Sequence, residues 1–400
     1  MSLAGPRPVL DCRTGVFLNG GGKTYFLTNN PWSNAMKLDR SRSLWPTAAI
    51  AGAAALLSLY DAGARHAFAF EACAHCAAAP GAIEVKDQTT APRVDIREWP
   101  TPTRGTHPHD PLATPDGAIW YTGQKVNLLG RLDPATGKVR EFPLKEPDSG
   151  PHGLVADKSG AIWFTAQAKG YIGKLDPASG EVREYIPKSA GRIDPHTPIF
   201  DKNGVLWFTA QGANLIGRLD PSSGEIALLS PPTKDSAPYG LVFGADGALY
   251  VAEFGANKIA RVDPATRRIE EFVLPSEDAR PRRIAATSDG YIWYTDFTRG
   301  RLGRLDPRNG EVVDWLSPGG AQSGPYAIAV LGDDIWYVET GAEQNMLVRF
   351  DAKTKSFAQW PIPSGGGVVR NMVATHAGGL ALACSGVDKI ALVTISPTAK

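Results

Sequence analysis

Cysteine is scarce in this 400-residue chain, which contains four. Cys12, Cys73 and Cys76 lie in the first 93 residues, and Cys384 stands alone in the remainder. So few and so widely separated thiols can build neither a disulfide framework nor a tetrahedral metal site. Cys73 and Cys76 form a spaced pair, but the histidine that haem attachment needs directly after Cys76 is missing. We therefore assign no function to the cysteines.

The chain also lacks an excess of charge of either sign. Lys and Arg number 42 against 41 Asp and Glu, which gives a formal net charge of +1, and no long run of one sign occurs. Proteins that bind nucleic acid or a membrane surface by electrostatics carry a basic patch or stripe. The sequence gives no sign of such a patch, and we expect neither kind of partner.

A long hydrophobic run is missing as well. The apolar stretch from Trp45 to Tyr60 is too short to span a membrane comfortably. A basic segment, Met36 to Arg42, precedes it, and small residues around Ala67 to Ala69 follow it. This order of segments is typical of a secretory signal peptide.

We therefore predict a signal peptide at residues 36–69, followed by a disordered linker at 70–93. Residues 1–35 are interpreted as a disordered leader or as an over-long start, with Met36 as the initiator. The expected location is the periplasm or the outside of the cell, with no membrane span after cleavage. A cytoplasmic protein with a disordered alanine-rich leader is the alternative.

The rest of the chain, residues 94–400, repeats one phrase at a nearly constant interval. Its opening recurs with spacings of 43, 44, 43, 43, 44 and 44 residues by subtraction, at Pro108, Pro151, Pro195, Pro238, Pro281, Pro325 and Val369. Each unit holds four short alternating or aromatic and β-branched runs, separated by turn chemistry such as Asp-Gly and Asp-Pro-x-x-Gly. Four strands per unit and this period predict an all-β fold, a seven-bladed β-propeller of four-stranded antiparallel blades.

The outer strands indicate how the ring closes. Six units end in an outer strand, but the seventh ends after Ile390 to Ile395. The segment from Val94 to Trp99, ahead of the first unit, has the pattern of the missing strand. We predict that it pairs into the last blade and leaves no open edge.

Two repeat positions place polar side chains on one face of the ring. The first position of the units, just after the opening Pro or Val, carries His109, His152, His196, Tyr239, Arg282, Tyr326 and Arg370. The position just past the second strand carries Gly123, Ala166, Ala210, Glu253, Asp296, Glu339 and Cys384. Antiparallel pairing brings the two positions together. Imidazoles facing a channel can hold a divalent metal or act as an acid or base, although polar side chains at a channel mouth can also serve only to solvate it.

The repeat resembles the virginiamycin B lyase (streptogramin lyase) family over about residues 94–397. The resemblance lies in the Pro-His-Gly opening, the Trp-Phe-Thr run, and phrases such as Ala-Asn-Leu-Ile-Gly-Arg at 213–218. It implies a propeller that opens a cyclic depsipeptide by elimination rather than hydrolysis, with a divalent metal, usually Mg²⁺, on the channel face. The family places a histidine, an acidic-Pro-His and a tyrosine at three consecutive blade starts.

In this chain the order occurs in a rotated position, at His152, at Asp194 with His196, and at Tyr239. The family's glutamate after the second strand is replaced by Ala210. The resemblance therefore implies a metal held by the four residues His152, His196, Asp194 and Glu253. That metal would polarise an ester carbonyl while His109 or His196 removes the proton α to it and Tyr239 orients the substrate.

Two other functions stay open at this stage. The first is a non-catalytic propeller that binds an envelope or peptide-like ligand, in which the recognition groups would be Arg282, Arg370 and the three acids Glu253, Asp296 and Glu339. For a substrate on the channel face, we expect the contacts at Arg282, Tyr326, Glu339 and Arg370. The second is a metal-dependent lactone hydrolase with a carboxylate cage drawn from Glu253, Asp296 and Glu339. In each case we expect a monomer that binds a small-molecule or peptide-like ligand on the channel face.

Overall fold

The computed structural model describes residues 16–18, 24–26, 91–188, 193–342 and 344–396. The chain divides into two units, Met1–Cys76 and Ala77–Lys400. In the first unit, β1 (Val16–Leu18) pairs antiparallel with β2 (Thr24–Phe26). Apart from these two strands and residues 91–93, the predicted leader, signal peptide and linker lie outside the described residues. No described helix is long and apolar enough to cross a membrane.

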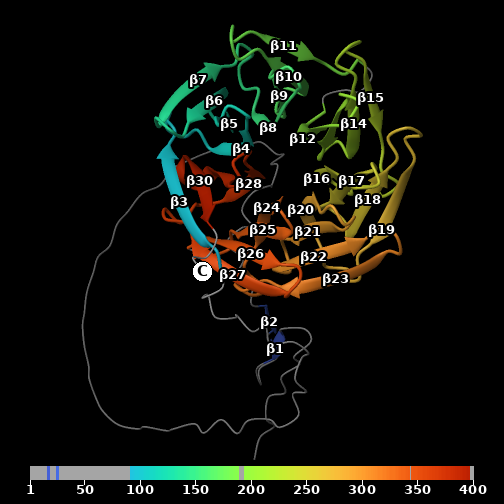
Figure 1. The fold of residues 1–400 in the computed structure, drawn as a ribbon. Helices are drawn as coiled ribbons and strands as arrows, with labels where there is room; N and C mark the ends of the chain where they lie inside the picture. Colours follow the sequence, from blue (N-terminus) through green and yellow to red (C-terminus); the bar gives the residue numbers. More distant parts are fainter. Residues whose placement is uncertain (1–15, 19–23, 27–90, 189–192, 343, 397–400) are drawn as a thin grey trace, which may run out of the picture. The chain divides into compact units, whose positions relative to one another are not determined.

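The second unit is a ring of seven four-stranded antiparallel sheets around a central axis, as predicted (Figure 1). The strands of blades one to three are β4 (Pro108–Ala113), β5 (Ile119–Gly123), β6 (Leu128–Asp133), β7 (Lys138–Pro143); β8 (Pro151–Ala156), β9 (Ile162–Ala166), β10 (Tyr171–Leu175), β11 (Val182–Tyr185); β12 (Pro195–Phe200), β13 (Leu206–Ala210), β14 (Leu215–Leu219) and β15 (Ile226–Leu229). Those of blades four and five are β16 (Pro238–Phe243), β17 (Leu249–Glu253), β18 (Lys258–Val262), β19 (Ile269–Val273); β20 (Pro281–Ala286), β21 (Ile292–Asp296), β22 (Arg301–Asp306) and β23 (Glu311–Leu316). Those of blades six and seven are β24 (Pro325–Leu331), β25 (Asp334–Glu339), β26 (Met346–Asp351), β27 (Ser356–Pro361); β28 (Val369–Ala374), β29 (Leu380–Cys384), β30 (Lys389–Ser396) and β3 (Arg93–Pro100), with a 3₁₀ turn, η2 (Ser385–Val387), before β30.

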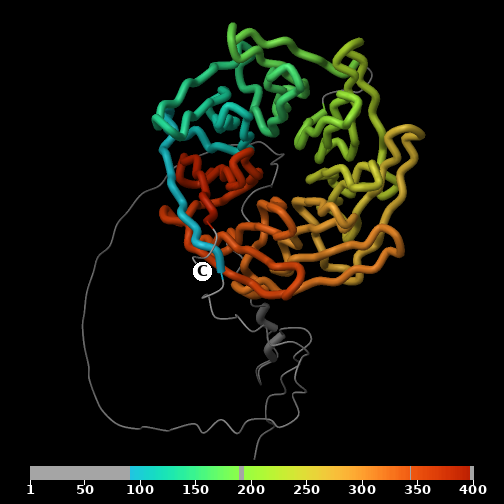
Figure 2. Tube along the Cα trace, viewed as in Figure 1, coloured from blue at the N-terminus to red at the C-terminus, as the bar shows by residue number. Residues whose placement is uncertain are grey.

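The N-terminal strand closes the ring, as the sequence predicts. β3 pairs antiparallel with β30 from Arg93↔Ser396 to Pro100↔Lys389, so the last blade combines both ends of the propeller. Figure 2 shows the start of the propeller lying beside its C-terminal segment. Trp99 packs into the core between blades seven and one, which ties the joined strand to the neighbouring blade.

The second strand of each blade is buried on both faces because it lies between neighbouring blades. In β9 all five residues, Ile162–Ala166, are buried. Trp163 packs against Tyr185 of its own blade and Phe200 of the next one, with ring centroids 5.2 and 5.6 Å apart. The recurring tryptophans, which we interpreted as packing residues, are buried at Trp120, Trp163, Trp207, Trp293 and Trp336.

The Ile-Gly-Arg phrase on the third strand also has a packing reason. A Cβ atom at Gly173 would overlap the ring of Phe164 on the adjacent second strand, and Gly217 faces Phe208 in the same way. Glycine is therefore required where the aromatic ring crosses the neighbouring strand. The motif that carries the resemblance is thus a packing device of the blade.

Every innermost strand contains a β-bulge just after its first residue. In β4, Pro108 pairs with Gly123 and Pro111 with Tyr121, so one extra residue lies between the pairs. The same shift occurs in the inner strands of the other six blades. A bulge redirects side chains locally. Here it falls at the two residues that follow the opening position.

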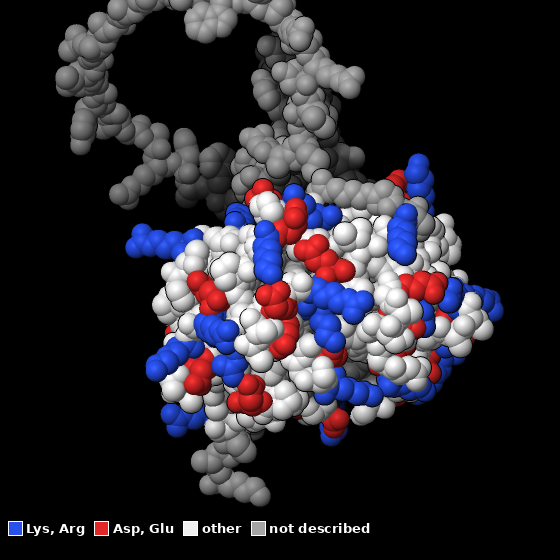
Figure 3. Space-filling model, turned by 90° about the horizontal axis from the view of Figure 1, so that it is seen from above, with Lys and Arg blue, Asp and Glu red and all other residues white. Residues whose placement is uncertain are grey.

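Positive and negative side chains are interspersed over the outer surface shown in Figure 3. Several of them pair across adjacent strands, such as Arg349 with Asp334 and Arg301 with Asp314. This surface agrees with the absence of charged runs in the sequence.

Candidate functional site

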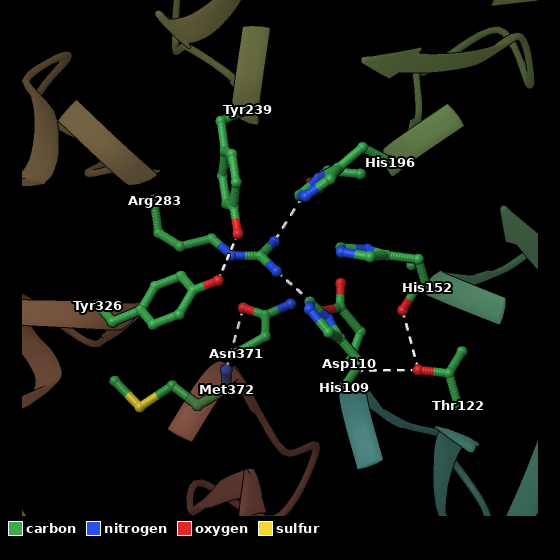
Figure 4. A network of polar contacts seen from close by, with 12 residues as sticks. His109, Asp110, Thr122, His152, His196, Tyr239, Arg283, Tyr326, Asn371 and Met372 are labelled. Carbon is green, nitrogen blue, oxygen red and sulfur yellow. Dashed lines mark hydrogen bonds and ion pairs between the residues drawn. The ribbon is translucent and has the colours of Figure 1, made fainter. Parts of the chain in front are cut away.

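The residues just after the opening prolines of blades one to four form a continuous row of tilted rings at the centre of the propeller, called here the histidine stack (Figure 4). The ring centroids of His109 and His152 lie 3.6 Å apart, those of His152 and His196 lie 3.7 Å apart, and those of His196 and Tyr239 lie 4.1 Å apart. Each of these side chains is at most 3% exposed. The structure therefore brings together His109, His152, His196 and Tyr239, four of the predicted site residues.

Threonines of the second strands hold this stack in place. The Thr122 hydroxyl accepts a hydrogen bond from the backbone N–H of Asp110 at 3.0 Å and donates to the carbonyl of His152 in the next blade at 2.9 Å. Thr165 and Thr209 connect their own blades to the carbonyls of His196 and Tyr239 in the same way. The Trp-Phe-Thr run thus fixes the spacing between neighbouring ring residues.

The three histidines are neutral at physiological pH. Burial lowers the pKa of each one well below the ordinary value of 6.5, and the positive charge of Arg283 lowers it further. Nδ1 of His109 lies 2.9 Å from a carboxylate oxygen of Asp110, and Nδ1 of His196 lies 2.8 Å from the hydroxyl of Thr197. Nδ1 of His152 is buried and has no hydrogen-bond partner among the described residues.

A second polar layer, which sequence reasoning missed, follows the bulge residues. Arg283 of β20 reaches across the channel and donates to Asp110 of β4 at 2.8 Å and to Thr197 of β12 at 3.3 Å (Figure 4). Arg283 is 3% exposed and Asp110 is 2% exposed, so this is a buried ion pair between blades one and five. The available signal was a charged residue two positions after the opening proline of two inner strands, at Asp110 and Arg283.

Two tyrosines and an arginine complete the opposite side of the ring. The hydroxyls of Tyr239 and Tyr326 are hydrogen-bonded to each other. The guanidinium of Arg282 lies 3.7 Å from the ring centroid of Tyr326, a cation–π contact. Burial acts to raise the pKa of Tyr239, but the charges of Arg282 and Arg283 together with the hydrogen bonds to Tyr326 and Arg282 outweigh it, so this pKa lies below its ordinary value.

The predicted acidic residues do not join the histidine stack. The carboxylate of Asp194 accepts hydrogen bonds from the backbone N–H groups of Gly212 and Ala213 at 2.7 and 2.9 Å, and so caps a turn. Glu339 accepts from the backbone N–H of Gly319 at 2.7 Å.

Glu253 stands apart from these two, because its buried carboxylate oxygens have no hydrogen-bond partner among the described residues. Burial raises its pKa to about 7. The third acid of the expected hydrolase cage, Asp296, pairs with Arg299 at 3.1 Å.

The residues that could hold a metal differ from the expected set. Within the described part of the chain, one group of three ligand-type side chains converges, namely His109, Asp110 and His152. Its only carboxylate already accepts from Arg283, so a divalent cation would have to share that carboxylate with a guanidinium close beside it. Like charges at this separation in a buried site repel strongly. The donor set as it stands does not fit a divalent metal.

Comparisons with known proteins agree with the fold and the repeat. The Virginiamycin B lyase family matches residues 88–330. A virginiamycin B lyase from Staphylococcus aureus is 26% identical with a TM-score of 0.69, covering 76% of this chain and 99% of that one. A streptogramin B lyase structure is 26% identical with a TM-score of 0.70 and coverages of 78% and 100%. A catalytically inactive histidine-to-alanine variant of the S. aureus enzyme, solved with quinupristin, is 26% identical with a TM-score of 0.68 and coverages of 76% and 99%. No curated protein matches the sequence.

Proposed function

Because the chain belongs to the virginiamycin B lyase family, we propose that it is a carbon–oxygen lyase that opens an ester bond of a peptide-like ligand by elimination. The observation that supports this proposal most directly is the stack of neutral imidazoles beside Tyr239, at the centre of the ring. A neutral imidazole is the form that can accept a proton. We assign the reaction to this stack.

His109 is the best-placed base. The Asp110 carboxylate can only accept hydrogen bonds, so Nδ1 of His109 donates to it and Nε2 keeps a free lone pair. An aspartate in this position orients the ring and stabilises the imidazolium that forms when a proton is taken up. His196 has a neutral partner, the Thr197 hydroxyl, and is therefore less suited to hold the charge.

The proposed step balances without water. Nε2 of His109 removes the proton from the carbon next to a carbonyl group, and the electron pair left behind forms a carbon–carbon double bond. The bond from the adjacent carbon to the ester oxygen breaks, and that oxygen leaves as part of a carboxylate. The Tyr239 ring packs against His196 and, as predicted from the resemblance, would orient the substrate.

Incubation with quinupristin, followed by mass spectrometry, tests this reaction. Elimination opens the ring and leaves the mass unchanged, so we expect a product with a new retention time and the parent mass. His109→Gln should lower kcat/KM by about 100-fold or more, the usual size of a general-base contribution. His376→Gln removes an exposed histidine of the chain and should leave the rate unchanged.

Two outcomes would contradict the proposal. A product heavier by one water molecule would indicate a hydrolase. Binding of quinupristin without any product would indicate a non-catalytic ligand-binding propeller.

A further inference from the structure

Two arginines of the central ring have no acidic partner. Arg282 of β20 and Arg370 of β28 directly follow the opening residues Pro281 and Val369, are partly buried, and form no ion pair among the described residues. The Nε atom of each is buried and lacks a hydrogen-bond partner in the described part of the chain. The Nε atom of Arg283 is unpartnered as well, but Arg283 has the acidic partner, Asp110, that the other two lack. Partly buried guanidinium groups without an acidic partner are costly, which points to a negatively charged ligand.

The charges around the histidine stack support the same conclusion. Three guanidinium groups, those of Arg282, Arg283 and Arg370, face one paired carboxylate, that of Asp110, so positive charge is in excess. Both unpaired arginines lie close enough to act on the stack. Arg370 lowers the pKa values of His109 and His152, and Arg282 lowers that of His196.

The chemistry of an elimination requires a group of this kind. Breaking the ester bond places a full negative charge on the departing carboxylate, and a preorganised positive charge at that position lowers the barrier. A guanidinium matches the planar carboxylate through paired N–H donors. Contacts with aromatic rings, 3.7 Å from the centroid of Tyr326 and 4.3 Å from that of Phe297, hold the guanidinium of Arg282 in a fixed position.

We propose that Arg282 and Arg370 form a carboxylate-binding site on the channel face, which receives the leaving group and supplies the positive charge that the family resemblance attributes to a metal ion. This inference rests on the proposed function for the origin of the carboxylate. Arg283 instead pairs with Asp110, whose carboxylate lies 2.9 Å from Nδ1 of His109.

Calorimetric titration with benzoate, with benzamide as the neutral counterpart, tests the site without turnover. The wild-type protein should bind benzoate and not benzamide, in the presence of a chelator. Arg282→Gln and Arg370→Gln should each weaken benzoate binding by about tenfold or more, the loss expected for a charge-assisted hydrogen bond. Arg282→Lys keeps the charge and should recover part of the affinity. Arg183→Gln changes an exposed arginine on β11 and serves as the matched control.

The outcomes separate this inference from the proposed function. Benzoate binding that survives both glutamine substitutions, or that appears only after Mg²⁺ is added, would overturn the carboxylate site. A protein that binds benzoate through these arginines but leaves quinupristin intact would retain the site and lose the lyase proposal. Undiminished turnover of quinupristin in the double glutamine variant would retain the lyase proposal and overturn the carboxylate site.

Discussion

At the scale of single residues, the site is defined by three imidazoles that the fold buries away from solvent. His109, His152 and His196 are each at most 2% exposed, and burial is the first cause that lowers their pKa values. The unfolded chain returns them to water, where they take up protons near the ordinary value of 6.5. Folding and protonation are therefore linked.

We predict that the protein loses stability as the pH falls below 6.5, the value that unfolded histidines titrate around. The sign follows from the lowered pKa values of the histidines: the unfolded state binds more protons than the folded state, so the histidine contribution to stability is complete above 6.5 and declines below it. The raised pKa of Glu253 acts in the opposite direction, but one carboxylate opposes three histidines. Each buried histidine contributes about 1.4 kcal/mol per pH unit. Urea unfolding at neutral pH and at about pH 5 measures the decline.

Comparison of variants isolates the histidine contribution from that of the carboxylates. His152→Gln should make the pH dependence shallower by about one proton, because its ring no longer titrates in the unfolded state. His376→Gln, at an exposed position, serves as the control for the substitution itself. A His152→Gln protein with the parent's slope would show that the buried ring is charged in the folded state.

The repeat register alone was enough to predict which side chains lie together at the centre of the ring. The positions of His109, His152, His196 and Tyr239 follow from counting along the units, and the structure brings these four side chains together. The role of Asp110 depends on the bulge and on Arg283 arriving from the far side of the ring, which no local pattern encodes.

Asp194 shows the opposite limit of residue-level prediction. It lies two residues before the ring histidine His196 in the sequence. Its carboxylate nevertheless accepts hydrogen bonds from two backbone N–H groups, and no sequence pattern indicates these contacts.

At the scale of elements, the strands were predictable because each carries its own period and turn. The four runs per unit became four strands, and the segment predicted as Val94 to Trp99 became β3, Arg93–Pro100. The recurrent bulge was not predicted. The bulge inserts one residue between paired positions of an otherwise regular strand. The innermost strands are too short for their alternation of polar and apolar residues to reveal it.

We predict that loss of β3 destabilises the whole propeller rather than one blade. Trp99 belongs to the core between blades seven and one, while Val94 and Ile96 pack against the core of blades five to seven. A chain that begins after Pro100 would expose the edge of β30 together with these side chains. We expect a loss on the order of several kcal/mol, measured by thermal or urea unfolding.

Two further proteins make this test decisive. A chain that starts at Ala91 keeps β3 and should unfold like the full-length protein. Trp99→Ala keeps the strand but leaves a cavity, for a cost of about 3–5 kcal/mol. If the chain without β3 unfolds like the parent, the closing strand carries no stability and the ring is held by the other blades alone.

At the scale of the whole molecule, this chain shares its family and fold with two lyase structures, which align with it over almost the whole of their own length. The two lyase structures align over 99% and 100% of their own chains, yet over 76% and 78% of this one. The propeller accounts for that shared portion, since β3 begins at Arg93. What lies before it must be explained by the sequence itself.

We predict that this preceding segment directs export and is then removed. Basic residues from Met36 to Arg42, the apolar stretch from Trp45 to Tyr60 and the small residues at Ala67 to Ala69 follow the order that signal peptidases recognise. The gene for this 400-residue chain, expressed in a Gram-negative host, should yield a periplasmic protein whose N-terminus, determined by intact-mass measurement and Edman sequencing, lies close to residue 70.

Arg40→Glu and Arg42→Glu together reverse the charge of the leading segment, so they should retain the uncleaved chain in the cytoplasm. The control pair Arg93→Glu and Arg97→Glu lies beyond the predicted cleavage point and should still be exported. An uncleaved cytoplasmic product from the unaltered gene would favour an alanine-rich leader instead, and would place the carboxylate site and its ligand inside the cell.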